Sequence, residues 1–188
     1  MSEQHDPDDP VRVDLDADAH EGLANILRAA VFGVQDGIVS TFGLVMGVAG
    51  ARISPEAVLI AGVAGMVSGA LSMGAGEYVS VRVQRELLLA RGARPQRAAD
   101  PVRAALANAG LFLLGGALPL LPFVLLRDLA AIATSSVVSI GSLFLAGALL
   151  TRLTGVSPVR SGLRMLVVGG GAGALGFLVG SLLGVAVG

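Results

Sequence analysis

The stretch LRAAVFGVQDGIVSTFGLVMGVAG, residues 27–50, has the length and composition of a membrane-spanning helix. Apart from Arg28 near its start, Asp36 is its only charged residue. A carboxylate inside a membrane helix costs about 2.5–3.5 kcal/mol on insertion scales, and such groups usually bind or move something. The search for a function therefore starts at Asp36. The alternative is a structural hydrogen bond within or between helices.

Four further segments of similar character follow, at 56–81, 104–126, 129–151 and 163–187. The chain is 54% hydrophobic and only 14% charged, with a mean hydropathy of +0.78. We therefore expect an all-α integral membrane protein with five transmembrane helices. Only Arg127 and Asp128 separate the third helix from the fourth, which predicts a tight hairpin. Pro119 and Pro122 predict a kink in the third helix.

The first 24 residues differ from the rest because they are polar and acidic. They hold eight of the fourteen acids and both histidines. We expect residues 1–24 to be a disordered cytosolic tail and residues 25–188 to form the five-helix domain. Cation collection by the tail is the alternative.

The arginines are distributed very unevenly over the loops. Five spans place eleven arginines on the side of the N-terminus and two, Arg52 and Arg127, on the other. The positive-inside rule then predicts a cytosolic N-terminus and an external C-terminus. All thirteen basic residues are arginine, which fits a GC-rich bacterial genome. We therefore expect a bacterial cytoplasmic membrane.

Two side chains fall at the same predicted depth in the first two helices. Asp36 lies eight residues from Arg28, or about 12 Å, and Met73 lies nine residues from Arg82, or about 13.5 Å. Glu77 lies about 7.5 Å in, one turn closer to the cytosol on the same face as Met73. These three residues form the predicted site.

A carboxylate and a thioether suit a borderline transition metal such as Fe(II) or Mn(II). One chain offers few ligands, so a homodimer that doubles them is expected. Protons compete with the metal for the carboxylate oxygens, which is a physical basis for exchanging metal for protons. The alternatives are that Met73 and Met66 only fill space, and that Glu77 pairs with Arg82 or Arg85.

Glycines recur at four-residue spacing, in Gly33/Gly37, Gly43/Gly47 and Gly65/Gly69, and in a ladder from Gly176 to Gly188. Such faces let helices approach closely, and Gly33 and Gly37 could instead leave room for an ion or water. The basic loop 82–103 could touch anionic lipid headgroups or act only as a topology signal. No catalytic constellation can be assembled on the spans, so we expect neither an enzyme nor a bound cofactor.

Three stretches resemble the vacuolar iron transporter family, including its nodulin-like members: residues 30–51, 61–86 and 152–170. Residues 100–123 fit as well. The resemblance implies a five-helix homodimer that exports Fe(II), and often Mn(II), from the cytosol in exchange for protons. It also implies that Asp36 and Met73 line the translocation path, and Glu77 matches the glutamate of the family's G-E-Y motif.

The chain departs from the family pattern at three places. Ala29 and Gly65 stand where many members carry acids, and only about 87–100 replaces a cytosolic metal-binding domain. These losses favour an alternative function, a non-transporting membrane scaffold or sensor that retains the fold. A transporter of a small organic cation is a second alternative, but the chain has one Tyr and no Trp to line its cavity.

Overall fold

The computed structural model describes residues 10–90, 100–154 and 157–187 and contains five helices in those ranges. They are α1 (Pro10–Gly50), α2 (Pro55–Ala90), α3 (Pro101–Leu125), α4 (Asp128–Thr154) and α5 (Pro158–Val187). Each includes a segment long and apolar enough to cross a membrane, with mean hydropathy between 1.5 and 1.9. The predicted all-α fold with five spans is confirmed.

The helices extend beyond the predicted apolar segments. Four of the five begin at a proline, whose fixed φ and missing N–H suit the first turn of a helix. Apolarity marks only the part that crosses the membrane, whereas adding a turn to an existing helix costs little. This also explains why α1 already begins at Pro10, inside the segment 1–24 expected to be disordered. Residues 1–9 lie outside the described residues.

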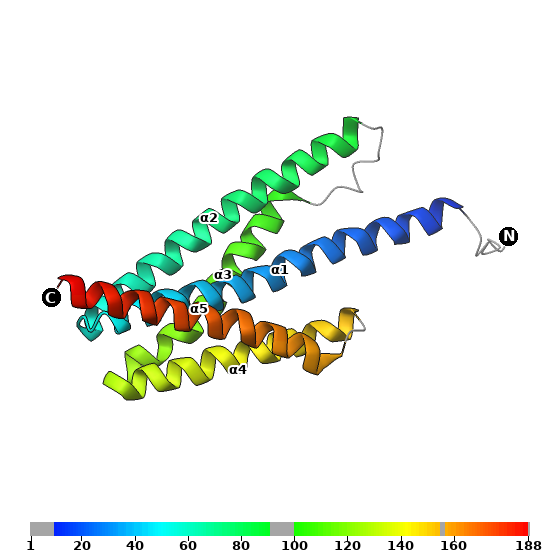
Figure 1. Cartoon of the computed structure of the whole chain (residues 1–188). Coiled ribbons are helices and arrows are strands. Elements are labelled where there is room, and N and C mark those ends of the chain that lie inside the picture. Colours follow the sequence, from blue (N-terminus) through cyan, green and yellow to red (C-terminus); the bar gives the residue numbers. More distant parts are fainter. Residues whose placement is uncertain (1–9, 91–99, 155–156, 188) are drawn as a thin grey trace.

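Helix α1 is the centre of the bundle (Figure 1). It packs most extensively on α3 and α5, and α2 packs mainly on α3. Helix α4 lies against α5 and the C-terminal part of α3. The largest buried cluster joins α1, α2, α3 and α4 near the α1–α2 and α3–α4 turns, through Phe42, Val45, Val58, Leu120 and Ala131. The bundle is thus densest at the end opposite the arginine-rich loops.

The turn between α3 and α4 is as short as predicted. Only Leu126 and Arg127 separate the helices, and Asp128 has a left-handed φ of 53°. The Ser135 hydroxyl of α4 donates to the carbonyl oxygen of Pro119 in α3 at 2.8 Å. Arg127 also forms a 3.3 Å ion pair with Glu56, which ties this turn to the start of α2. Helix α3 runs through Pro119 and Pro122, and its kink stays a prediction.

Glycines bring α1 into backbone contact with two neighbours. A Cβ at Gly37 would collide with the Phe112 carbonyl of α3, and one at Gly33 would meet Asn108. On the outer half, Gly176 and Gly180 of α5 lie against the backbone at Gly43 and Gly47. The predicted close packing is therefore observed. The space beside Gly33 and Gly37 is filled by α3, so the expectation of room for an ion there is wrong.

Candidate metal centre

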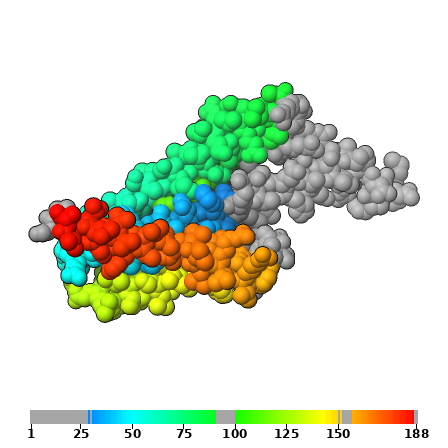
Figure 2. Space-filling model, viewed as in Figure 1, coloured from blue at the N-terminus to red at the C-terminus, as the bar shows by residue number. Residues whose placement is uncertain are grey.

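Asp36 lies on a stripe of α1 that the described helices cover only in part. Phe32, Asp36, Ser40 and Leu44 follow one another at four-residue spacing and share one side of the helix. Phe32 is 54% exposed, Leu44 is 37% exposed, and Ser40 is also exposed, whereas Asp36 is half-buried. Figure 2 shows part of α1 at the surface between α2 and α5. Asp36 therefore lies on a side of α1 that is at least partly accessible.

The Ser40 hydroxyl donates to the backbone oxygen of Asp36, not to its carboxylate. Among the described residues, no hydrogen bond or ion pair to the Asp36 carboxylate is recorded. A structural hydrogen bond, the alternative explanation for this acid, therefore has no observed partner in that part of the chain. The carboxylate oxygens are available as ligands.

Met73 and Glu77 lie on the side of α2 that continues from Gly65 and Gly69. All four positions are half-buried and spaced by four residues. Gly65 meets the side chain of Leu44, the outermost residue of the α1 stripe. The two rows of side chains therefore converge at Leu44 and Gly65. From there α1 and α2 splay apart toward the arginine-rich end, as Figure 1 shows.

Helix α3 fixes the relative depth of the two rows. Its Phe112 meets both Gly37 of α1 and Gly69 of α2. One turn away, Asn108 meets Gly33 of α1, and Ala109 meets Gly74 of α2. Asp36 lies between Gly33 and Gly37, and Met73 lies between Gly69 and Gly74. Asp36 and Met73 therefore lie level with the same turn of α3, and so at the same depth in the bundle.

The same contacts change the expected relation between α1 and α2. The short connection at residues 51–54 predicts that the first two helices run antiparallel as neighbours. They do meet near their turn, where Gly62 contacts Val45. At the depth of Asp36, however, both helices pack on Phe112 of α3. A direct contact between Asp36 and Met73 stays a prediction.

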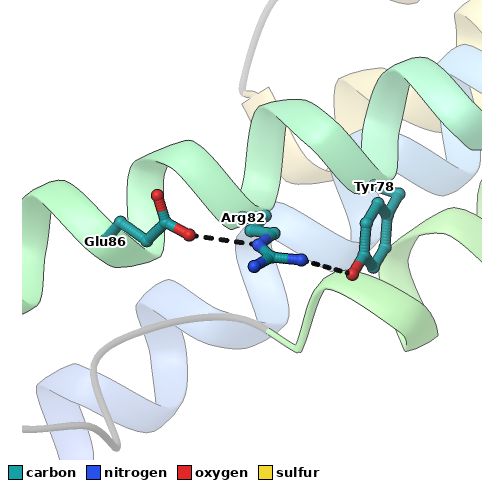
Figure 3. Close-up of polar contacts among 3 residues, drawn as sticks. All are labelled: Tyr78, Arg82 and Glu86. Carbon is teal, nitrogen blue, oxygen red and sulfur yellow. Dashed lines mark hydrogen bonds and ion pairs between the residues drawn. The ribbon is translucent and has the colours of Figure 1, made fainter.

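Met66 and Glu77 can be compared with their alternative explanations. Met66 packs against the buried cluster and lies beside Gly116 of α3, which matches a space-filling role. Glu77 was a candidate partner for Arg82. Arg82 donates instead to Tyr78 at 3.1 Å and to Glu86 at 3.0 Å, along one side of α2 (Figure 3). Arg82 is thus engaged elsewhere, and among the described residues Glu77 forms no ion pair with Arg85, the other candidate partner, so its role as a ligand stays a prediction.

Sequence reasoning missed Asn108, which is only 1% exposed and whose Oδ1 has no hydrogen-bond partner among the described residues. A buried amide in a membrane helix is costly for the same reason as Asp36. That signal could have identified it from the segment 104–126. In the part of the chain that the structure describes, no three His, Cys, Asp or Glu side chains come together as a metal cluster.

Two of the family departures have local explanations. Ala29 is almost fully buried, at 3% exposure. A side chain at Gly65 would collide with the end of Leu44. Alanine and glycine at these positions therefore match the local packing.

Comparisons with known proteins agree with this architecture. The VIT family model matches residues 27–100 and 89–181. The chain is 38% identical over 190 residues to "Vacuolar iron transporter homolog 5" of Oryza sativa subsp. japonica, covering 94% of this chain and 88% of the relative. It is 33% identical over 202 residues to "Vacuolar iron transporter homolog 1" of Arabidopsis thaliana, covering 97% and 98%.

A third relative, "Vacuolar iron transporter homolog 1" of Oryza sativa subsp. japonica, is 40% identical over 160 residues. That match covers 78% of this chain and 68% of the relative. The matched residues include α1 from residue 27 onward and all of α2, and hence Asp36, Met73 and Glu77. This chain, an integral membrane protein with five spanning helices, belongs to the VIT family.

Proposed function

We propose that this protein moves Fe(II), Mn(II) or both out of the cytosol in exchange for protons, with Asp36, Met73 and Glu77 as ligands. One observation carries the proposal. Asp36 on α1 and Met73 on α2 lie level with the same turn of α3, on sides of their helices that no described helix covers fully. The relatives' names, which specify iron transport, support a metal ion as the cargo.

The ligand chemistry assigns a different part to each side chain. Asp36 supplies hard oxygen ligands, and the Met73 thioether favours a softer ion over Mg²⁺ or Ca²⁺. Glu77 lies one turn toward the arginine-rich end, where it receives the ion or accepts a proton. A proton and a metal ion bind the same oxygens, so loading one displaces the other.

A second copy of the chain completes this site. The open stripe of α1 continues outward into an apolar groove of about 800 Å³ between α1 and α5, lined by Gly43, Leu44, Gly47, Gly176 and Gly180 among others. A lipid-facing carboxylate is costly, whereas a two-fold partner laid along the stripe covers it and doubles the ligands. The homodimer is thus part of the proposal.

The direction of transport, out of the cytosol, is the one that the family resemblance implies, and the arginine distribution favours a cytosolic N-terminus. The bacterial cytoplasmic membrane rests on composition alone. The relatives described above are plant proteins whose names specify the vacuole, so they lend it no support. In either membrane the proposed direction is out of the cytosol.

One observation favours the alternative of a scaffold or sensor that does not transport. Ala29 is buried and Leu44 fills the space beside Gly65, so two acids common in relatives are absent and their places are packed. A protein that had lost transport would show such filling. It would have no reason to keep Asp36 on an open stripe.

The test is metal uptake into proteoliposomes under a pH gradient, with Fe(II) and Mn(II) measured separately. Asp36→Asn and Met73→Leu should each lower the initial rate at least tenfold, and Glu77→Gln should lower it less. Matched controls are Asp128→Asn, at the α3–α4 turn, and Met165→Leu, on α5 beside Gly147. A wild-type protein that moves neither ion supports the scaffold. Normal transport by Asp36→Asn would refute the site.

A further inference from the structure

A second feature lies at the arginine-rich end, away from Asp36. A cavity of about 360 Å³ separates the end of α2 from the start of α3. Its lining includes Tyr78, Arg82, Arg85 and Glu86 of α2, together with Asp100, which precedes α3. The membrane-spanning segment of α3 begins at Pro101, so the cavity lies at the level of the lipid headgroups.

Tyr78, Arg82 and Glu86 form a preorganised row on α2 (Figure 3). The Arg82 Nε donates to Glu86 at 3.0 Å, and its Nη1 donates to the Tyr78 hydroxyl oxygen at 3.1 Å. The guanidinium is thereby held along the wall of the cavity. The phenol accepts from Arg82 and keeps its own O–H for donation to another acceptor.

The two carboxylates in the lining each have positive partners. Glu86 pairs with Arg82. Asp100 accepts from the backbone N–H groups of Val102 at 2.9 Å and Arg103 at 3.0 Å. The Arg103 N–H lowers the pKa of Asp100 most, and the charges of Arg103 and Arg85 lower it further. The lining holds two arginines and two acids, so its formal charge is zero. Glu86 is paired with Arg82 and Asp100 accepts from the backbone of α3, so among the described residues no carboxylate forms an ion pair with the Arg85 guanidinium.

The rim of the cavity is apolar. On the membrane side of the cavity, Val102 of α3 is 54% exposed, and Leu106, one turn further into the span, is 69% exposed. A small hydrated anion gains nothing from such a rim, whereas the first methylenes of an acyl chain do. Guanidinium and phenol donors above an apolar rim match a phospholipid, with its phosphate above its acyl chains.

We propose that this cavity binds the phosphate headgroup of an anionic phospholipid from the leaflet on the arginine-rich side. Arg85 and Arg82 contact the phosphate, Tyr78 donates to one of its oxygens, and Val102 and Leu106 contact the acyl chains. Arg82 and Arg85 are then more than a topology signal. This site is separate from the metal path, so it stands or falls independently of transport.

Lipid binding can be measured on the full chain in nanodiscs and by native mass spectrometry after detergent extraction. Phosphatidylglycerol should remain bound and raise the thermal midpoint, whereas phosphatidylcholine should do neither. Arg85→Gln should reduce the bound phosphatidylglycerol at least fivefold. Tyr78→Phe, a milder change, should reduce it about twofold, and it preserves the test if Arg85→Gln fails to fold. Arg160→Gln is the matched control, an exposed arginine near the start of α5.

Three outcomes would overturn the proposal. An equal loss in Arg85→Gln and Arg160→Gln would indicate general attraction between arginines and anionic lipid. An equal thermal shift from inorganic phosphate would indicate a site for free anions. Unchanged phosphatidylglycerol binding in both Arg85→Gln and Tyr78→Phe would place the lipid elsewhere.

Discussion

The two sides of α1 are built differently. The side toward α3 carries Gly33 and Gly37, and there the helix backbones touch with no space for a methyl group. The other side carries Asp36, Ser40 and Leu44, all at least partly accessible in the single chain. Only two residues separate Gly33 from Asp36 along the sequence, yet Gly33 fixes the bundle and Asp36 contributes little to its packing.

This difference separates stability from function. The side of α1 that packs on α3, here called the closed side, determines where α1 lies. Because Phe112 of α3 also contacts Gly69 of α2, α3 positions α2 relative to α1. The open side is then free to carry a charged group at a fixed depth. Substitutions on the two sides should therefore change the stability of the protein in opposite directions.

The largest effect is expected on the closed side. Gly37→Ala places a methyl group against the Phe112 carbonyl, and backbone cannot move aside as a flexible side chain can. Overpacking of this kind costs about 3 kcal/mol or more. Gly110→Ala on α3 is the matched control, because a Cβ there meets nothing within 4 Å. Alanine has a higher helix propensity than glycine, so Gly110→Ala should stabilise the protein by up to about 1 kcal/mol.

Thermal unfolding in nanodiscs, followed by circular dichroism, measures both variants. The midpoint should fall sharply for Gly37→Ala and stay level or rise for Gly110→Ala. If the two alanines shifted it equally, the closed side of α1 would lose its special status.

Asp36→Leu should act in the opposite direction on the open side. Removing a carboxylate from a membrane helix should stabilise the protein, by at most about 2.5–3.5 kcal/mol, while abolishing metal uptake. The same protein should be assayed for its thermal midpoint in nanodiscs and for transport in proteoliposomes. A lower midpoint together with lost transport would mean that Asp36 is a structural residue.

Hydropathy alone was sufficient to predict the five helices, because each span must satisfy its backbone within the membrane. The same reasoning singled out Asp36, since a charge there is conspicuous against apolar neighbours. Its matching depth with Met73 followed from the helical rise, and α3 provides the common reference. The position of α3 was not predictable, because contacts such as Phe112 with Gly37 and Gly69 depend on how helices pack.

Asn108 shows a different limit. Its burial against Gly33 makes it notable, yet in sequence it is one polar residue in an otherwise apolar segment. The extension of α1 back to Pro10 was missed because composition describes solvent preference and not helix propagation. The roles of Asp36, Met73 and Glu77 as ligands remain predictions for the transport assay.

A smaller loss of stability is expected at Gly65 of α2, which lies beside Leu44 at the end of the open stripe of α1. Gly65→Glu brings a carboxylate into the space that the end of Leu44 now fills. Because a side-chain end can shift, the cost should be about 1–2 kcal/mol, below that of Gly37→Ala. Leu44→Ala should relieve it, so the double variant should be more stable than the two single losses predict. A double-mutant cycle of thermal midpoints measures this coupling, and strict additivity would contradict the contact.

The smallest effect concerns Asp100, which lies outside the spans and caps α3. The backbone N–H of Arg103, helped by that of Val102 and by nearby arginines, holds the pKa of Asp100 below its usual value. A folded-state pKa below the unfolded one gives stability that is present above about pH 4 and is lost as pH falls through the folded value. Asp100→Asn can still cap the helix but does not titrate there. Between neutral pH and about pH 3, the thermal midpoint of the wild type should therefore fall further than that of Asp100→Asn. All other carboxylates titrate in both proteins, so parallel curves would show that the cap contributes nothing to the acid sensitivity of the bundle.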